Sequence, residues 1–316
     1  MPRMLVTGGA GFIGSHVTEA LVERGHEVRV LDNLITGHRE NLAAVANEVD
    51  FHEADLRDID AVRNAARDVE VVFHIGALPS VPRSMKDPTT TFECGVVGTH
   101  NVLEAGRAHG VRRVVFASSS SVYGSNPQIP KVETMQTCPV SPYALSKLVG
   151  EQYMQLWHSA LGLETVSLRF FNVFGPRQDP TSMYSGVLSR FITALLREEP
   201  PTVFGDGTQS RDFTYVANVV DGVLRAADAP AATGQIINLA CGNRISLNQI
   251  LEKLHEELAP VPAVYGDWCA GDVRHSQADN TRARELLGWM PTVSFEDGLR
   301  KTIDWYLARQ PIERMA

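Results

Sequence analysis

Short apolar runs alternate with longer amphipathic stretches along the first half of the chain. Strands are predicted at residues 4–7, 28–31, 49–56, 71–77, 114–117 and 165–170, where apolar residues gather between glycines or polar residues. Helical spacing of apolar residues marks residues 15–23 and 90–109, and another helix is predicted from residue 141. Strands that alternate with helices predict an α/β fold with a doubly wound parallel sheet, covered on both faces.

The rhythm changes after residue 176. Residues 177–207 indicate a loop, one helix and a short strand, and residues 211–216, a helix to 229 and a strand at 235–239 indicate a return to the sheet. A helix at 247–258 is then followed by scattered proline, glycine and tryptophan. We therefore expect one domain of residues 1–172, rejoined by 212–240. Residues 173–211 and 241–316 would form a smaller mixed α/β domain that ends in a frayed tail at 312–316.

A glycine-rich turn follows the first predicted strand. Gly8, Gly11 and Gly14 are spaced G-x-x-G-x-x-G before a helix, so the backbone can approach a pyrophosphate that the helix N-terminus attracts. Asp32 ends the second strand, where a carboxylate can accept hydrogen bonds from an adenosine ribose and would repel a 2′-phosphate. These residues predict a Rossmann-type domain that binds NAD rather than NADP. A plain turn and a helix cap are the alternatives for the glycines and Asp32.

Residues 141–147 combine a helix start with candidate chemistry. Ser141 suits an N-cap, Pro142 suits the first helical position, and Tyr143 and Lys147 then share one helix face. Lowering a tyrosine pKa from about 10 to near 7 requires about 4 kcal/mol. One positive charge at ~6 Å supplies roughly 3 kcal/mol at an effective dielectric of about 20. A nicotinamide ring could supply the second charge and make Tyr143 a base; an exposed surface pair is the alternative.

Polar residues also end other strands. Asp55 ends the third predicted strand, and a run of four serines, residues 118–121, ends the fifth. Ligands of open parallel sheets lie outside the carboxyl ends of the strands, so these residues are candidates for a site, although a serine run is often only a loop. His74, within the fourth strand, is interpreted as a core histidine with hydrogen-bond partners rather than a catalyst.

Composition and charge narrow the function classes. The 316 residues are 44% hydrophobic and 21% charged, which is typical of a globular protein of one large or two interlocked domains. A net charge of −8 argues against general binding to nucleic acid or anionic membranes, and no apolar run is long enough to span a bilayer. The first residues lead straight into a strand, so no signal peptide is expected. Four cysteines without zinc-binding spacing indicate a cytoplasmic protein with no structural metal.

Together these motifs resemble the extended short-chain dehydrogenase/reductase family over nearly the whole chain. The resemblance rests on the glycine loop at Gly8, the serines at 118–121, Tyr143-x-x-x-Lys147 and the pair Arg211-Asp212. Residues 171–180 and 271–279 look most like those of the nucleotide-diphosphate-sugar 4-epimerases. The resemblance implies NAD-dependent epimerisation of a UDP-sugar at carbon 4 through a 4-keto intermediate, and a homodimer formed through the helices at 90–109 and 143–160.

The resemblance also implies residue roles. Tyr143 would be the base, Lys147 would hold the nicotinamide ribose and lower the Tyr143 pKa, and Ser119 would bond the same sugar oxygen. Cofactor-binding residues would be Gly8, Gly11, Phe12, Ile13, Gly14, Asp32, Asn33, Asp55, Leu56, Ala77, Tyr143, Lys147 and Phe170. Substrate-binding residues would be Ser119, Ser120, Ser121, Tyr143, Asn172, Val187, Leu188, Phe204, Arg211, Phe213, Arg274 and Ser276. No metal is implied.

Single positions separate the related activities. Dehydratases and decarboxylases of this fold need an acid or base where this chain has Ser120 and Ser121, and uronate 4-epimerases tend to place a cation where it has Asp179. Ser276 is small enough to leave room for an N-acetyl group, which favours UDP-N-acetylglucosamine beside UDP-glucose as a substrate. A UDP-glucuronate 4-epimerase, a one-way reductase and a non-catalytic nucleotide-binding protein are the alternatives.

Two residues depart from the epimerase pattern. Cys269 stands where an arginine is expected on the diphosphate, and Arg274 could replace it. Gly95 stands where an asparagine is usual in the helix after the fourth strand.

Overall fold

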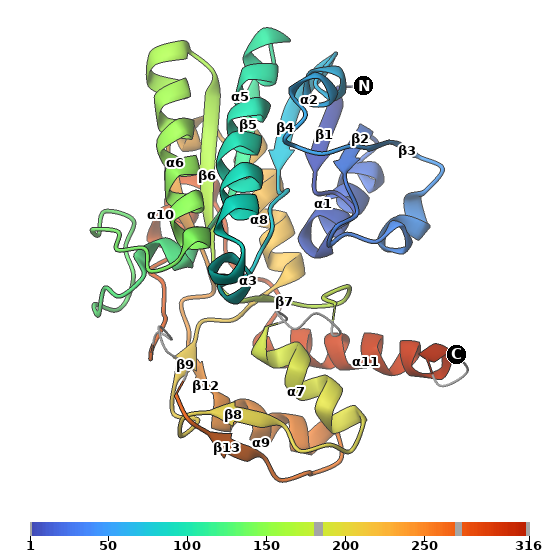
Figure 1. The fold of residues 1–316 in the computed structure, drawn as a ribbon, viewed down its shortest axis with the longest axis vertical. Coiled ribbons are helices and arrows are strands. Elements are labelled where there is room, and N and C mark those ends of the chain that lie inside the picture. The colour runs from blue at the N-terminus through green and yellow to red at the C-terminus, as the bar shows by residue number, and fades with distance from the viewer. Residues whose placement is uncertain (1, 180–185, 269–273, 314–316) are drawn as a thin grey trace.

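A seven-stranded parallel sheet is the centre of the fold in the computed structural model, which describes residues 2–179, 186–268 and 274–313 (Figure 1). The strand order is β3-β2-β1-β4-β5-β6-β11. The strands are β1 (Arg3–Thr7), β2 (Glu27–Asp32), β3 (Val49–Glu53), β4 (Val69–His74), β5 (Arg113–Ser119), β6 (Glu164–Phe170) and β11 (Ile236–Leu239). The doubly wound, Rossmann-type sheet expected from the alternating pattern is confirmed.

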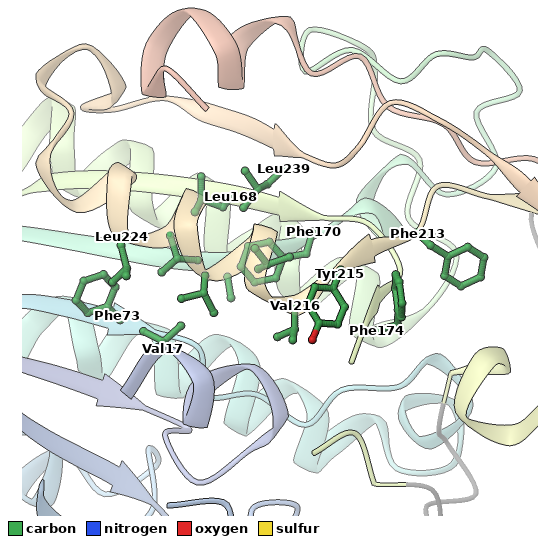
Figure 2. Packing of buried hydrophobic residues seen from close by; sticks show 14 of the residues in the cluster. Val17, Phe73, Leu168, Phe170, Phe174, Phe213, Tyr215, Val216, Leu224 and Leu239 are labelled. Carbon is green, nitrogen blue, oxygen red and sulfur yellow. The ribbon is translucent and has the colours of Figure 1, made fainter. Parts of the chain in front are cut away.

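Helices cover both faces of this sheet. They are α1 (Phe12–Glu23) and α8 (Val216–Asp228) on one face, and α2 (Ile59–Ala65), α5 (Gly98–Ala108) and α6 (Pro142–Leu161) on the other. Adjacent residues of a strand point to opposite faces of the sheet. Val6 packs in the hydrophobic cluster under α1 and α8, whereas Leu5 packs in the cluster under α2, α5 and α6. Figure 2 shows Val17, Phe73 and Leu224 in the first cluster, which continues past the strand ends to Phe174 and Phe213.

Short helical segments join the larger elements. They are η1 (Arg39–Val45), α3 (Val81–Lys86), α4 (Pro88–Phe92), the π-turn η2 (Glu93–Val97), η3 (Ser120–Tyr123) and η4 (Pro230–Ala232). The helix predicted at 90–109 is therefore α4, η2 and α5 in succession. A Cβ on Gly95 of η2 would lie 2.7 Å from the Ser146 hydroxyl on α6. Close packing between η2 and α6 thus leaves no space at Gly95 for the expected asparagine side chain unless Ser146 moves.

Most of the remaining elements lie below the carboxyl ends of the sheet strands in the view of Figure 1, where α7, β8, β9, β12, α9, β13 and α11 are labelled, whereas α10 lies beside the sheet. The remaining elements are β7 (Val173–Phe174), α7 (Val187–Leu196), β8 (Thr202–Phe204), β9 (Ser210–Arg211), β10 (Thr214–Tyr215), β12 (Ile245–Ser246), α9 (Leu247–Glu257), β13 (Val264–Gly266), α10 (Thr281–Leu287) and α11 (Phe295–Glu313). Three two-stranded sheets pair β10 with β7, β12 with β9 and β13 with β8.

Two expectations for this half of the chain need correction. α8 and β11 return to the large sheet as expected, but residues 211–216 do not join it, because Arg211 pairs with Ile245 and Tyr215 with Phe174. Residues 312 and 313, expected in a frayed tail, belong to α11. The buried positions Leu299, Ile303 and Tyr306 recur at helical spacing along α11, which explains why this segment forms a helix.

Candidate active site

A cavity of about 990 Å³ opens along the carboxyl ends of the parallel strands. One part is lined by Gly8, Asp32 and Tyr143 of the sheet domain, and another by Phe204 and Arg211. Every residue expected to bind the cofactor lines this cavity: Gly8, Gly11, Phe12, Ile13, Gly14, Asp32, Asn33, Asp55, Leu56, Ala77, Tyr143, Lys147 and Phe170. The cavity lies where open α/β sheets bind their ligands.

The glycine loop leaves space and donors for an anion. Gly8 has φ of 67°, and a Cβ there would lie 2.6 Å from the backbone of Gly76. A Cβ on Gly14 would lie 2.0 Å from the Gly8 carbonyl, so no larger residue fits. Gly11 caps α1 without a side-chain hydrogen bond, which leaves N–H groups of the first turn available. This part of the cavity fits a pyrophosphate.

Asp32 and Asp55 stand at the ends of neighbouring strands. The two oxygens of Asp32 accept from the N–H groups of Leu34, at 2.8 Å, and Ala10, at 3.0 Å. Burial nevertheless raises the pKa of the Asp32 carboxyl, against those two bonds. Asp55 lies two residues beyond β3; hydrogen bonds from Arg57 lower its pKa to about 2, and Asn33 donates to it at 2.8 Å. The hydrogen bond from Asn33 to Asp55 therefore joins the loop after β2 to the loop after β3 beside the cavity.

α6 begins as the sequence predicts, with Ser141 as its N-cap and Pro142 as its first residue. Ser141 accepts from the N–H of Ala144 at 3.1 Å, and Pro142 occupies the first turn. The Lys147 ammonium donates to the Ala117 carbonyl at 2.7 Å and lies 6.0 Å from the centre of the Tyr143 ring. A hydrogen bond joins the side chains of Tyr143 and Ser119. The helix thus brings a phenol, an ammonium and a serine hydroxyl together.

Burial dominates the titration of this pair. It lowers the pKa of Lys147 to about 8, against the favourable charge of Glu151. It raises the pKa of Tyr143, and the opposing contribution comes from the bond to Ser119. The expected lowering of the Tyr143 pKa by Lys147 is therefore not found in the protein chain alone. The positive charge of a nicotinamide, which the sequence argument also required, remains necessary for a phenolate near neutral pH.

The serines at the end of β5 and the start of η3 have different hydrogen-bond partners. The Ser119 hydroxyl accepts from the Ser121 hydroxyl at 2.9 Å, beside Ser120 at the start of η3. The Ser118 hydroxyl instead donates to the buried carboxylate of Glu151 at 2.5 Å. Ser119, Ser120 and Ser121 all line the cavity, so hydroxyl groups occupy the two positions where the related activities require an acid or base.

The other side of the cavity carries a cation, an amide and an aromatic ring. Asn172, in a left-handed conformation with φ of 35°, donates to the Asp212 carbonyl at 3.0 Å. The Arg211 guanidinium donates to the Ser210 carbonyl at 3.0 Å. The Phe204 ring is 37% exposed and lies 5.5 Å from the Arg190 guanidinium. Asn172, Val187, Phe204, Arg211 and Ser276 all line the cavity.

Three residues expected at the substrate do not line the cavity. Leu188 faces the core from α7 and is 2% exposed. Phe213 is buried beside Phe174, as Figure 2 shows, and also contacts Phe295. The Arg274 guanidinium lies 3.8 Å from the Asp206 carboxylate and against the Trp268 ring. Their side chains are used for packing and surface charge pairing instead. Cys269 and residues 271–273 lie outside the described residues.

The cavity also contains residues that sequence reasoning missed. Arg190 stands three residues after Val187 on α7, so helical periodicity alone could have placed it on the same face. Lys131 and Gln209 line the cavity from segments without a periodic pattern, and gave no such signal. His74 is the core histidine we expected: Thr7 and Thr99 contact its two ring nitrogens at 2.8 and 3.0 Å.

Residues 4–240 match the NAD dependent epimerase/dehydratase family. The chain belongs to this family, and its cofactor is NAD. It is 41% identical over 309 residues to a UDP-glucose 4-epimerase of Mycolicibacterium smegmatis, covering 96% of this chain and 98% of that one. It is 34% identical over 317 residues to a UDP-glucuronate 4-epimerase of Thermodesulfobacterium geofontis, covering 96% of both.

A solved structure is similar over its full length. The UDP-N-acetylglucosamine 4-epimerase from Methanobrevibacter ruminantium, in complex with UDP-N-acetylmuramic acid, superposes with a TM-score of 0.93 at 36% identity, covering 98% of this chain and 99% of that one. Across the part of the chain that the structure describes, no helix combines the length and apolarity needed to cross a membrane. The same residues contain no group of three His, Cys, Asp or Glu able to hold a metal ion.

Proposed function

We propose that this protein is an NAD-dependent 4-epimerase of UDP-hexoses. One observation carries the proposal: the Tyr143 hydroxyl, bonded to Ser119 and flanked by the buried ammonium of Lys147, lines the same cavity as the glycine loop. A proton-transfer group therefore stands at the end of a nucleotide site, where the reacting carbon of a sugar could meet the nicotinamide. The UDP-sugar epimerases among the relatives support this assignment.

Each catalytic residue has a distinct task in this proposal. The glycine loop and Asp32 would hold NAD, which would supply a reversible hydride acceptor for carbon 4 of the sugar, so that the hydride could be returned to the opposite face of the 4-keto sugar. Tyr143, as a phenolate, accepts the proton of the 4-hydroxyl and later gives it back. Ser119 bonds the same oxygen. Ala117 accepts one of the three donors of Lys147, so two donors are left for the nicotinamide ribose, and the ammonium charge stabilises the phenolate.

The substrate residues divide by chemistry. Arg211 and Asn172 would hold the diphosphate, since a guanidinium binds phosphate through paired charge-assisted hydrogen bonds. Phe204 would contact the uracil. Val187, which lines the same cavity, would also contact the substrate. Ser276 would face the sugar and leave room for an N-acetyl group. The side chains of Leu188, Phe213 and Arg274 are left out of this assignment, because they do not line the cavity.

UDP-glucuronate 4-epimerisation is the second candidate, and the relative that is 34% identical over 96% of this chain favours it. Asp179 lines the cavity, and a carboxylate there would repel the sugar carboxylate. Dehydratase and decarboxylase activities are opposed by the hydroxyl groups of Ser120 and Ser121.

Product analysis tests the proposal. NAD-loaded protein is incubated in deuterated water with UDP-glucose, UDP-N-acetylglucosamine or UDP-glucuronate, and the products are identified by NMR and mass spectrometry. We expect the first two sugars to be interconverted with their 4-epimers without deuterium at carbon 4, because the hydrogen is returned from the cofactor. Turnover of the uronate alone, a pentose product or a stable 4-keto-6-deoxy sugar would overturn the proposal.

We infer a homodimer formed through the face of α5 and α6. Leu145 and Leu156 of α6 are each 52% exposed and stand three helical turns apart, so they lie on one face. Light scattering should give twice the chain mass, and Leu156→Arg should give the monomer.

We also infer a cytoplasmic location, in keeping with the free cysteines Cys94, Cys138 and Cys241 among the described residues.

A further inference from the structure

A buried ion pair lies one helical turn behind Lys147. Glu151 follows Lys147 by four residues on α6 and is 1% exposed. Two nitrogens of Arg169, on β6, donate to its two carboxylate oxygens, each at 2.8 Å. The Ser118 hydroxyl donates to one of the same oxygens at 2.5 Å. Tyr143, Lys147 and Glu151 therefore form one row along α6, with the carboxylate at its inner end.

Stability alone is a weak reason for this pair. Removing two charges from water costs several kcal/mol per ion, and apolar residues of similar volume often stabilise a core as well or better. Arg169 and Glu151 are 3% and 1% exposed, so both charges carry that cost. An electrostatic effect of this ion pair on a neighbouring group would explain why two charges are buried here.

The carboxylate of the pair belongs to Glu151, one helical turn from Lys147 on α6. The carboxylate of Glu151 is on the same helix face as Lys147 and favours the charged ammonium, which burial opposes. The Arg169 guanidinium extends to the other side, where it lies 4.6 Å from the Tyr123 ring and donates to the Glu133 carbonyl at 3.4 Å. Lys147 itself donates to the Ala117 carbonyl, so Glu151 acts on it through charge rather than through a direct hydrogen bond.

The other titratable groups around Lys147 do not supply this charge. His74, on β4, is buried in its neutral form, and the positive charge of Lys147 contributes to keeping it neutral. Tyr143 precedes Lys147 on α6 and is protonated in the protein chain alone, since burial raises its pKa. Burial likewise raises the pKa values of Tyr123, on η3, and Cys94, on η2. Glu151 is thus the anion that the packed elements bring to Lys147.

We propose that Glu151 is a positioning residue of the active site: its carboxylate, fixed by Arg169 and Ser118, keeps the Lys147 ammonium charged where water is excluded. The consequence for catalysis rests on the proposed function, because a neutral Lys147 could not stabilise the Tyr143 phenolate. The charge state of Lys147 is a property of the folded chain and can be measured without turnover.

The test is an NMR titration of Lys147 in the NAD-loaded protein. The chain contains five lysines, so labelling lysine with ¹³C at Cε gives few signals, and Lys147→Arg assigns the relevant one. The central variant is the double replacement Glu151→Gln with Arg169→Met, which removes both charges and leaves no unpaired buried ion. Glu151→Gln alone is compared wherever it folds. Arg169→Lys keeps the carboxylate and its cation, and serves as the matched control.

Loss of the Glu151 charge alone should lower the titration midpoint of Lys147 by about one pH unit, the effect of one charge at roughly 10 Å in an effective dielectric of about 20. The double variant should lower the midpoint by less than this, because loss of the Arg169 charge acts in the opposite direction. The Arg169→Lys control should leave the midpoint in place. An unchanged midpoint in the folded double variant would overturn the inference. The basic limb of the epimerisation pH–rate profile should move with the midpoint, whereas a purely structural role would lower the rate equally at every pH. If no sugar nucleotide is epimerised, the proposed function fails while the titration still decides the role of Glu151.

Discussion

Acidification from pH 7 to pH 5 should destabilise this protein through His74. The imidazole is 1% exposed, Thr7 and Thr99 occupy its nitrogens, and burial followed by the Lys147 charge lowers its pKa from 6.5 to about 3. At pH 5 the unfolded chain protonates His74 and the folded chain does not. The difference of 1.5 units between pH 5 and the unfolded pKa corresponds to about 2 kcal/mol, at 1.36 kcal/mol per unit. This stability is present above pH 6.5 and is lost as the pH falls toward 3.

Chemical unfolding at both pH values isolates this contribution. His74→Gln keeps groups that can bond the two threonines but cannot titrate, so the loss of unfolding free energy between pH 7 and pH 5 should be about 2 kcal/mol smaller than in the wild type. His16, whose pKa burial lowers to about 4, should behave similarly at pH 5 when replaced by glutamine. His109→Gln, at an exposed position, is the control. An equal pH effect in wild type and His74→Gln would refute the reasoning.

Three further predictions concern the site. Tyr143→Phe should keep the fold and bound NAD yet reduce epimerisation by about 10² to 10⁴, the usual cost of losing a general base; near-normal steady-state rates would contradict its role. Asp32→Ala should weaken NAD binding measured by calorimetry on nucleotide-free protein, and equal wild-type affinity for NAD and NADP would remove the reason given for Asp32. Ser276→Tyr should stop turnover of UDP-N-acetylglucosamine by steric clash and spare UDP-glucose in a product assay, so an unaffected acetylated substrate would show that Ser276 does not border the acetyl group.

The parts of the fold that could be predicted have local causes. A strand followed by Gly8, Gly11 and Gly14 needs only backbone geometry to form the nucleotide loop, and the cap at Ser141 fixes where α6 begins. Because four residues separate Tyr143 from Lys147, the helix alone brings them to one face. The location of the cavity follows in turn from the parallel sheet, whose carboxyl ends share one edge.

The missed features depend on contacts between distant segments. The short strands at Arg211 and Tyr215 exist only because Ile245 and Phe174 pair with them, and no local pattern specifies those partners. The direction in which a single side chain points also depends on distant residues: Phe213 packs against Phe174 and Phe295 and does not line the cavity. The burial that raises the Tyr143 pKa likewise comes from the assembled site, so the sequence argument, which counted only charges, could not include it.

The edge strand β11 has a consequence for synthesis on the ribosome. Ile236 pairs with Ser167 and Leu239 with Phe170, so β6 has an unpaired edge until the chain past residue 239 has emerged. An open edge offers free N–H and C=O groups to any other strand, including one from a neighbouring nascent chain. The nascent sheet domain is therefore exposed to mispairing over the whole interval in which residues 171–239 are made, and a chaperone that shields β6 during that interval would raise the yield of folded enzyme.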